Sequence, residues 1–226
     1  MVEQLTLEAR AARHSALAEP TRLRIVDLLQ LGDASPALVQ RHLGISSNLL
    51  AHHLAQLAAA GIIARHRSEG DRRRTYIRLV PGTLDFLGGA PTLAAERVLF
   101  VCTGNSARSQ LAAALWSQMS DVPALSAGTH PGPGVAPGAV AVAARHGLSL
   151  ADARPRHIAD VATGGELIVT VCDSAFEEIG DDARLHWSIG DPVPVGSQRA
   201  FDEAFAQIAA RVEHLAPHVT KEGIPS

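Results

Sequence analysis

The sequence is poor in cysteine, with only Cys102 and Cys172 among its 226 residues. Two cysteines cannot form the disulfide framework of a small secreted domain or a four-cysteine zinc site, so each is expected to be catalytic, redox-active or buried. No apolar run reaches the roughly 18 residues of a membrane span, and no signal-peptide pattern opens the chain. The sequence therefore predicts a cytoplasmic protein with no membrane segment, no bound metal and no bound cofactor.

Charge is distributed unevenly along the chain, although the net charge is only −3. Residues 1–90 carry 11 arginines and 8 acidic residues, whereas residues 91–226 carry 9 basic and 15 acidic residues. A basic half followed by an acidic half indicates two domains with different partners. Two prolines and three glycines within residues 81–95 predict a linker. We therefore expect domains at 1–84 and 96–226, joined by residues 85–95.

Apolar periodicity and stop signals in the first domain predict helices followed by a hairpin. Helices are expected over residues 8–31, with a new start near Glu19, and over residues 36–42 and 46–60. Strands are expected over residues 62–67 and 75–79, with Gly70 in the turn between them. This order is that of a winged helix, mostly α with a β-hairpin wing.

The last two helices of this domain form a predicted helix–turn–helix motif, whose second helix enters a major groove. Polar side chains that can meet phosphates or base edges lie early in that helix: Ser46, Ser47, Asn48, His52 and His53. The adjoining hairpin has six arginines between residues 65 and 78, including Arg72, Arg73 and Arg74, which predict salt-dependent DNA contacts. Alone, such a hairpin is also typical of a solvated surface. Adjacent helical histidines point about 100° apart and make a poor metal chelate.

Several segments of the first domain carry a resemblance to the ArsR-type winged-helix repressors: Ala18–Leu23, Leu43–Ser46, His53–Leu54 and Gly61–Ile63. The resemblance covers about residues 8–80 and implies a homodimer that binds a palindromic operator and releases it on an inducer. Many family members sense arsenite through paired cysteines just before the Leu-Gly step. The matching stretch here, Ser35–Leu38, has no cysteine, which argues against arsenite sensing at that position.

The second domain shows apolar runs that alternate with helical patterns. Strands are predicted over residues 97–102, 124–126 and 166–172, and helices over residues 108–119, 138–146 and 201–215. Such alternation implies βαβ units and an α/β domain with a parallel sheet.

A thiol and an arginine flank a polar loop after the first strand of this domain, in the sequence Cys102-Thr-Gly-Asn-Ser-Ala-Arg108-Ser109. Backbone N–H groups of this loop can form an anion nest at a helix N-terminus, supplied by Thr103, Gly104, Asn105, Ser106, Ala107 and Arg108. The Arg108 fork can hold two oxygens of a tetrahedral oxyanion, and Gly104 and Asn105 tolerate a positive φ. The same field stabilises negative charge on the Cys102 sulfur, which Ser109 can hydrogen-bond. A nucleophile and an oxyanion site therefore arise together.

A displacement at a tetrahedral centre gains from a general acid, and Asp191 in the Gly-Asp-Pro sequence is the candidate. Asp-Pro is also a common turn pair, and a bare Cys-x5-Arg pattern recurs by chance. The apolar strand before Cys102 and the helix that begins near Ser109 favour the catalytic interpretation.

This domain resembles the low-molecular-weight protein tyrosine phosphatase superfamily, which includes an arsenate reductase branch. The matching segments are Cys102–Ser109, Ser126–Thr129, His146–Leu148, Arg154–Arg156 and Asp191–Pro192. The resemblance covers about residues 97–215. It implies a four-stranded parallel sheet and a Cys-x5-Arg phosphate loop, with Cys102 as nucleophile, Arg108 as oxyanion binder and Asp191 as acid.

Within that superfamily, the residues favour the reductase branch. Cys172 ends a strand where that branch has a resolving cysteine, and the pair His186-Trp187 precedes Asp-Pro as it does there. Val193 stands where the phosphatases usually have an aromatic residue. Against a three-cysteine relay, Ala107 and Ile179 occupy the places of the further cysteines. The alternative for Cys172 is a buried strand-end residue.

The leading hypothesis is an arsenic-responsive transcriptional regulator fused to an arsenate reductase that acts through a Cys102 adduct. Its expected partners are operator DNA, an arsenate or phosphate oxyanion, and an external thiol or redoxin as electron donor. One alternative is a low-molecular-weight phosphatase fused to the same DNA-binding domain. Another is an oxyanion-sensing repressor with little turnover.

Overall fold

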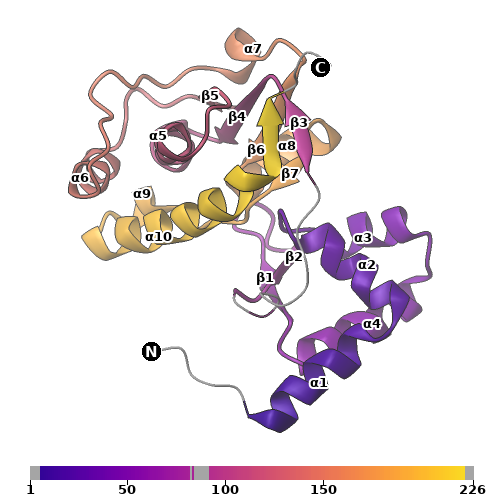
Figure 1. Cartoon of the computed structure of the whole chain (residues 1–226). Coiled ribbons are helices and arrows are strands. Elements are labelled where there is room, and N and C mark those ends of the chain that lie inside the picture. The colour runs from indigo at the N-terminus through magenta and orange to yellow at the C-terminus, as the bar shows by residue number, and fades with distance from the viewer. Residues whose placement is uncertain (1–5, 82, 84–91, 222–226) are drawn as a thin grey trace. The chain divides into compact units, whose positions relative to one another are not determined.

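The computed structural model describes residues 6–81, 83 and 92–221 of the chain (Figure 1). Contacts divide the chain into two compact units. The first unit comprises Met1–Arg67 and Arg72–Ala90, and the second comprises Ser68–Asp71 and Pro91–Ser226. Among the helices in the described ranges, none is both long enough and apolar enough to cross a membrane.

The first unit contains helices followed by a hairpin: α1 (Leu7–Leu17), α2 (Pro20–Leu29), α3 (Pro36–Leu43), α4 (Ser47–Ala59), β1 (Ile63–Arg67) and β2 (Thr75–Leu79). Each helix begins after a side chain that accepts a backbone N–H, and these capping residues are Thr6, Glu19, Ser35 and Ser46. Gly44 ends α3 with a left-handed φ of 65°, which turns the chain into α4. The winged-helix prediction is confirmed.

One apolar core joins the helices of the first unit to its hairpin. Its most buried members are Ile25, Val26, Val39, Leu54, Leu57, Ile62 and Ile77. β1 and β2 pair antiparallel, from Ile63 with Leu79 to Arg67 with Thr75. Ala34, before α3, exchanges two backbone hydrogen bonds with Ile77 at 3.0 and 2.8 Å. This single bridge adds a third chain segment beside β2 of the hairpin.

The second unit is built on a four-stranded parallel sheet in the order β5-β4-β6-β7. Its strands are β4 (Arg97–Cys102), β5 (Ala124–Gly128), β6 (Glu166–Thr170) and β7 (Leu185–His186). The interior strand β4 is buried from Val98 to Cys102, as expected for a parallel strand that is covered on both faces. The predicted α/β fold with four parallel strands is confirmed.

Helices connect and cover this sheet: α5 (Arg108–Met119), α6 (Pro137–Arg145), α7 (Ile158–Val161), α8 (Asp173–Ile179), α9 (Pro192–Val195) and α10 (Gln198–Leu215). α10 packs against α5 and α6, whereas α8 contacts β4 and β6 (Figure 1). Phe100 of β4 has its ring 5.8 Å from that of Trp116 and 5.7 Å from that of Trp187. These ring contacts pack the strand that ends at Cys102 against α5, which carries Trp116, and against the segment that carries Trp187.

The structure departs from the predicted elements at the ends of strands. β3 (Leu93–Ala95) pairs in parallel with β8 (Val219–Lys221), although the sequence pattern places residues 93–95 in the linker. The linker therefore ends before Leu93, and its residues 85–91 lie outside the described part of the chain. β6 ends at Thr170 instead of residue 172, because Cys172 already caps α8.

Candidate active site

The loop between β4 and α5 brings the Cys102 sulfur to the N-terminus of a helix. The Asn105 N–H donates to Cys102 Sγ at 3.2 Å, and the Ser109 hydroxyl lies 3.1 Å from the same sulfur. Cys102 is only 2% exposed. Two hydrogen-bonding groups and the helix N-terminus thus converge on one nearly buried sulfur.

Asn105 is the residue that shapes the loop. Its φ of 48° is the one positive φ found for a non-glycine residue in the described ranges, and Gly104 has no positive φ. The left-handed turn therefore falls on Asn105 alone, although the sequence pattern allows it at both positions. The Asn105 side chain donates to Ser109 Oγ at 2.8 Å and accepts from the Arg156 N–H at 2.9 Å. These bonds stabilise a backbone conformation that residues other than glycine rarely adopt.

Gln110 and Gly128 both contact the turn at Asn105. Gln110 Nε2 donates to the backbone and side-chain oxygens of Asn105, at 3.1 and 3.2 Å. A Cβ on Gly128 would lie 2.6 Å from the Thr103 carbonyl and 3.0 Å from Asn105. Only glycine allows β5 to approach the loop this closely.

Arg108 lies at the start of α5 with its guanidinium held on two sides. Nη2 is 2.8 Å from Asp191 Oδ2, and Nη1 donates to the Ile189 carbonyl at 2.8 Å. Burial acts to lower the pKa of Arg108, but the negative charges that Cys172, Cys102, Asp191 and Glu69 carry when ionised outweigh it and raise that pKa. The guanidinium is a permanent, oriented cation beside the Cys102 sulfur.

A pocket of about 220 Å³ opens over the loop. It is lined by Cys102, Thr103, Gly104, Ser106, Ala107, Arg108, Asp191, Val193 and Pro194. The predicted nucleophile, oxyanion binder and acid therefore face one space. Asn105, whose backbone N–H is also predicted to bind the oxyanion, is fully buried and is not among the lining residues. Val193 and Pro194 of α9 give this pocket an aliphatic wall.

Asp191 enters this pocket as the capping residue of α9. Its Oδ1 accepts from the Val193 N–H at 3.1 Å, while its Oδ2 faces Arg108. The Asp-Pro pair thus forms the turn that its sequence suggests and also places a carboxylate at the pocket. The turn and the acid interpretations are compatible.

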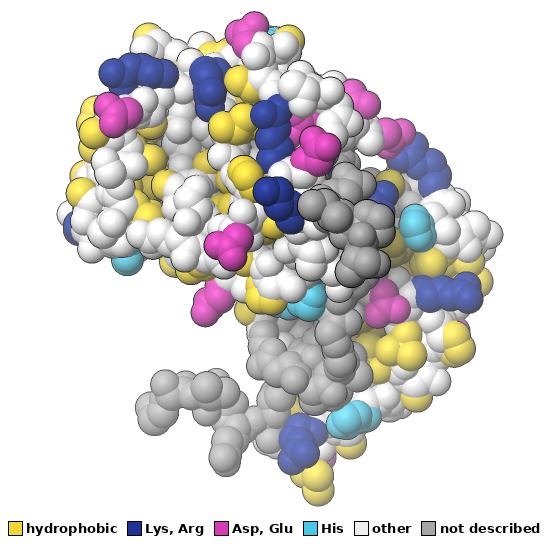
Figure 2. All heavy atoms as spheres, turned by 45° about the horizontal axis from the view of Figure 1, so that its top comes forward, with side chains coloured by type: hydrophobic (Ala, Val, Ile, Leu, Met, Phe, Trp, Pro, Cys, Tyr) yellow, Lys and Arg dark blue, Asp and Glu magenta, His cyan; other side chains and the backbone are white. Residues whose placement is uncertain are grey.

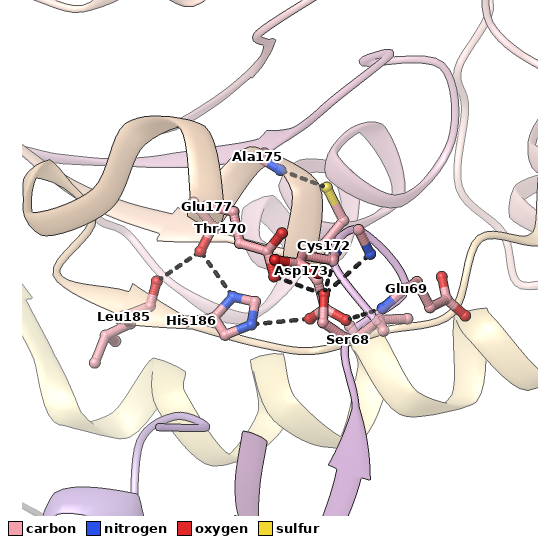
Figure 3. Close-up of polar contacts among 12 residues, drawn as sticks. Ser68, Glu69, Thr170, Cys172, Asp173, Ala175, Glu177, Leu185 and His186 are labelled. Atoms are coloured by element: carbon pink, nitrogen blue, oxygen red, sulfur yellow. Dashed lines mark hydrogen bonds and ion pairs between the residues drawn. The ribbon is translucent and has the colours of Figure 1, made fainter. Parts of the chain in front are cut away.

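Cys172 lies beside the loop but does not line the pocket. Its sulfur is 3.5 Å from Thr103 Oγ1 and accepts from the Ala175 N–H at 3.5 Å, which caps α8 (Figure 3). Because Val101 pairs with Thr170, Cys102 and Cys172 leave neighbouring parallel strands at the same edge of the sheet. Burial raises the pKa of the Cys172 thiol and outweighs the nearby Arg108 guanidinium.

A buried polar pair that the sequence reasoning missed adjoins Cys172. His186 Nε2 lies 3.1 Å from Asp173 Oδ1, and His186 Nδ1 lies 3.0 Å from Thr170 Oγ1 (Figure 3). Burial acts to raise the pKa of Asp173, but hydrogen bonds from His186, Ser188 and the Glu69 N–H outweigh it and lower that pKa. An acidic residue directly after a strand-end cysteine, with a histidine ending the next strand, is the signal that could have revealed the pair.

Ser68–Asp71, which belong to the second unit, lie against α8 and the loop that carries Asp191. The Ser68 hydroxyl donates to Glu177 Oε1 at 2.6 Å, and the Glu69 N–H donates to Asp173 Oδ2 at 2.7 Å (Figure 3). Glu69 Oε2 accepts from the Asp191 N–H at 2.8 Å. Nothing in the local sequence pattern indicates these contacts, because their partners lie more than 100 positions away along the chain.

The predicted DNA-contacting residues of the first unit divide into exposed and buried ones. Ser46, Ser47, Asn48, His52, Arg72, Arg73 and Arg74 are exposed. His53 is not: it is 6% exposed, and its Nδ1 lies 3.4 Å from Glu19 Oε2. This corrects the prediction for His53, because it packs on the core face with Leu50 and Leu54.

Glu19 itself serves as the cap of α2. Its carboxylate accepts the N–H groups of Thr21 at 3.0 Å and Arg22 at 2.9 Å. The Thr21 N–H is the main cause that lowers the Glu19 pKa to about 2. Figure 2 shows basic and acidic side chains interspersed among the coloured residues.

Each of the two regions matches the model of a known protein family or domain. Residues 97–224 match the model of the low molecular weight phosphotyrosine protein phosphatase family, and residues 17–66 match a helix-turn-helix domain model. The transcriptional repressor SdpR of Bacillus subtilis (strain 168) is 40% identical over 52 residues, which are 23% of this chain and 58% of that protein. The chain thus spans little more than half the length of this curated relative.

Two solved structures resemble the second unit. An arsenate reductase from Archaeoglobus fulgidus DSM 4304 is 32% identical with a TM-score of 0.48, over 54% of this chain and 99% of that one. The tyrosine phosphatase Wzb from Escherichia coli K30, in complex with sulphate, is 23% identical with a TM-score of 0.50. That match covers 54% of this chain and 97% of Wzb, and it shows a shared fold.

Proposed function

The chain belongs to the low molecular weight phosphotyrosine protein phosphatase family, and from this premise we propose that its second unit reduces arsenate to arsenite through Cys102. The observation that carries the proposal is the second thiol. Cys172 Sγ touches Thr103, the residue that follows the nucleophile, at the same edge of the sheet. Hydrolysis of a phosphoester needs one thiol, whereas reduction of arsenate with formation of a disulfide needs two.

The first step of this reaction is displacement at arsenic. The Cys102 thiolate attacks arsenate, a sulfur–arsenic bond forms and an arsenic–oxygen bond breaks. The departing hydroxyl takes a proton from the protonated form of Asp191 and leaves as water, and Asp191 is left as the carboxylate. The loop N–H groups and Arg108 hold the remaining oxygens. The incoming oxyanion takes the place of the Asp191 carboxylate on the Arg108 fork, which frees Asp191 to face the leaving oxygen.

The second step transfers two electrons. The Cys172 thiolate attacks Cys102 Sγ, a disulfide forms, and the electron pair of the sulfur–arsenic bond stays on arsenic. Arsenic is thereby reduced from the +5 to the +3 state and leaves as arsenite, while the two thiols are oxidised. An external dithiol or redoxin then reduces the disulfide. The attacking species is the thiolate, so the Cys172 thiol must release its proton to solvent before this step, and the raised pKa of this buried thiol makes that release less favourable.

The test is turnover by the purified full chain, with arsenate and a dithiol run beside an aryl phosphate. We expect arsenite production that is lost in Cys102→Ser and strongly reduced in Cys172→Ser. The matched control is aryl phosphate hydrolysis, which needs Cys102 but not Cys172. Arsenite production that is unchanged in Cys172→Ser would remove Cys172 from the reaction and leave an external thiol as the resolving group.

A phosphatase is the second candidate, and the family match favours it. The aliphatic wall of Val193 and Pro194 argues for a small phosphoester or inorganic oxyanion over a phosphotyrosine ring. Hydrolysis of aryl phosphate without any arsenate reduction would establish this candidate. Oxyanion binding with neither activity would instead support a sensor.

For the first unit, we propose that α4 and the hairpin bind operator DNA as part of a homodimeric repressor. The support is the helix-turn-helix match over residues 17–66 and the exposed side chains of Ser47, Asn48, His52 and Arg72. The test is selection of a binding sequence from random duplexes with the full chain. A palindromic sequence is expected, and its loss in an Asn48→Ala, His52→Ala double variant would place α4 in the groove.

A further inference from the structure

The segment Ser68–Asp71 is fixed to the second unit at both its backbone and its side chains. Ser68 is buried, and its hydroxyl donates to Glu177 and accepts the N–H groups of Gly70 and Asp71, at 3.0 and 3.1 Å. The Glu69 N–H donates to Asp173, whose carboxylate is already held by His186 (Figure 3). The segment therefore rests on a buried polar group that is itself ordered.

Gly70 allows the segment to lie this close to α8. A Cβ at this position would be 2.8 Å from Ser174 Oγ and Glu177 Oε2, and 3.1 Å from the Ser174 backbone. An alanine here would push the segment away from α8 without any change of charge.

The position of the segment puts the Glu69 carboxylate at the oxyanion site. Glu69 Oε2 accepts from the Asp191 N–H and lies 4.0 Å from Arg108 Nη1. Glu69 is also among the groups that raise the Arg108 pKa. Its side chain is half exposed, so water and salt weaken the attraction without removing it. A carboxylate is thus held near the cation that the substrate must reach.

We propose that Glu69 is an internal competitor for the oxyanion site: its carboxylate and a bound oxyanion oppose each other at Arg108, so that the segment Ser68–Asp71 sets the affinity of the site. This inference rests on the proposed function only in that the loop binds an oxyanion. A doubly charged oxyanion beside Arg108 meets the negative charge of Glu69, and the repulsion weakens binding of the anion. The same repulsion acts on the Glu69 side chain once the anion is bound.

The experiment is calorimetric titration of the full chain with inorganic sulfate and inorganic phosphate at low ionic strength. We expect Glu69→Gln to bind both anions about two- to fivefold more tightly, the range for a half-exposed ion pair. Gly70→Ala, which keeps Glu69 but displaces the segment, should tighten binding in the same direction. Added sodium chloride should shrink the difference between wild type and Glu69→Gln, because screening weakens the charge effect.

Matched variants separate competition from positioning. Glu203→Gln removes one exposed carboxylate of the same unit, which pairs with Arg199 on α10, and it should leave the affinity unchanged. Gln at position 69 keeps an oxygen that can accept the Asp191 N–H, whereas Glu69→Ala does not. Should Glu69→Gln bind as wild type does while Glu69→Ala binds more weakly, Glu69 only positions the loop, and the competitor idea is overturned.

The failure of this inference is distinguishable from the failure of the proposed function. Equal anion affinity in wild type and Glu69→Gln overturns the inference and leaves arsenate reduction standing. Anion binding by neither wild type nor Cys102→Ser overturns both. Tighter binding by Glu69→Gln without arsenite production supports the competitor and moves the enzyme to the phosphatase or sensor candidates.

Discussion

Ser47, Asn48 and Arg72 of the first unit are exposed, whereas Cys102 and Arg108 of the second are 2% and 6% exposed. Both groups are suited to binding phosphate-like anions, but the interactions that would hold the anion differ. Exposed arginines such as Arg72 attract the DNA backbone by charge, with an affinity that depends on salt, whereas Ser47 and Asn48 can only hydrogen-bond to it. The buried group is ordered before the anion arrives, and such preorganisation is what stabilises a transition state.

The largest expected effect is loss of reaction when the buried group is changed. Cys102→Ser should lower turnover at least about 10³-fold, because it removes the nucleophile from a group of residues that act together. DNA affinity in the absence of oxyanion should stay within twofold of wild type. The measurements are steady-state turnover and an electrophoretic mobility shift on one stock of protein. A parallel loss of DNA binding would contradict the view that the reaction at Cys102 and DNA binding by the first unit are independent.

The second-largest effect is expected when the packing of the Cys102–Arg108 loop is disturbed. Gly128→Ala should destabilise the second unit by about 1–3 kcal/mol, since its Cβ collides with the Thr103 carbonyl in a well-packed site. Turnover should fall with it. Gly134→Ala is the matched control, because its Cβ meets open space. Denaturant unfolding followed by tryptophan fluorescence reports the second unit, which contains both tryptophans of the chain, Trp116 and Trp187. Equal midpoints for the two variants would contradict the tight contact.

Acid should weaken both units over the same pH window. The pKa of Glu19 in the first unit and that of Glu166 in the second are each lowered from 4.5 to about 2. For Glu166, burial raises the pKa, but hydrogen bonds from Arg97, Thr163 and Gly164 outweigh it. A lowered folded-state pKa gives stability that is present above about pH 4.5 and is lost as the pH falls toward 2.

Thermal unfolding at pH 5 and pH 3 measures this effect. Wild type should lose more of its melting temperature between these pH values than Glu166→Gln, whose residue 166 does not titrate. Glu19→Gln should behave in the same way for the first unit. Identical losses in wild type and both variants would show that other carboxylates control the acid response.

The smallest effect is expected for a single exposed arginine. Arg72→Ala should weaken DNA binding by a similar factor on every sequence and lower the slope of log affinity against log salt by about 1. Binding isotherms between 50 and 200 mM salt give that slope. Arg199→Ala, on α10 of the second unit, is the control with an equal loss of charge. A sequence-dependent loss in Arg72→Ala would indicate base contact instead of phosphate contact.

Much of this architecture follows from local signals in the sequence. Gly44 between two helices, the apolar run before Cys102 and the Cys-x5-Arg loop are each encoded within about ten residues, and the structure contains these elements. His53 shows a signal that was present but misread: with Leu50, Leu54 and Leu57 it follows the helical spacing of a buried face. A polar residue on that spacing belongs to the core when a partner such as Glu19 is available.

Other features depend on contacts between distant parts of the chain. The Glu69 N–H meets Asp173, 104 positions later, and no local pattern predicts that bond. The placement of the positive φ on Asn105 instead of Gly104 depends on Gln110 and Arg156, which hold the asparagine in its turn. β3 and β8 are three residues long each, too short for any periodicity to reveal.

The short pairing of β3 with β8 gives the second unit a mechanical property. β3 begins at Leu93 and β8 ends at Lys221, and the two strands run in parallel. The two points therefore lie at opposite ends of the pair. Force applied to these two ends would load the hydrogen bonds of the pair together, in shear, instead of opening them one after another. The β3–β8 pair would then resist extension of this unit between its two ends.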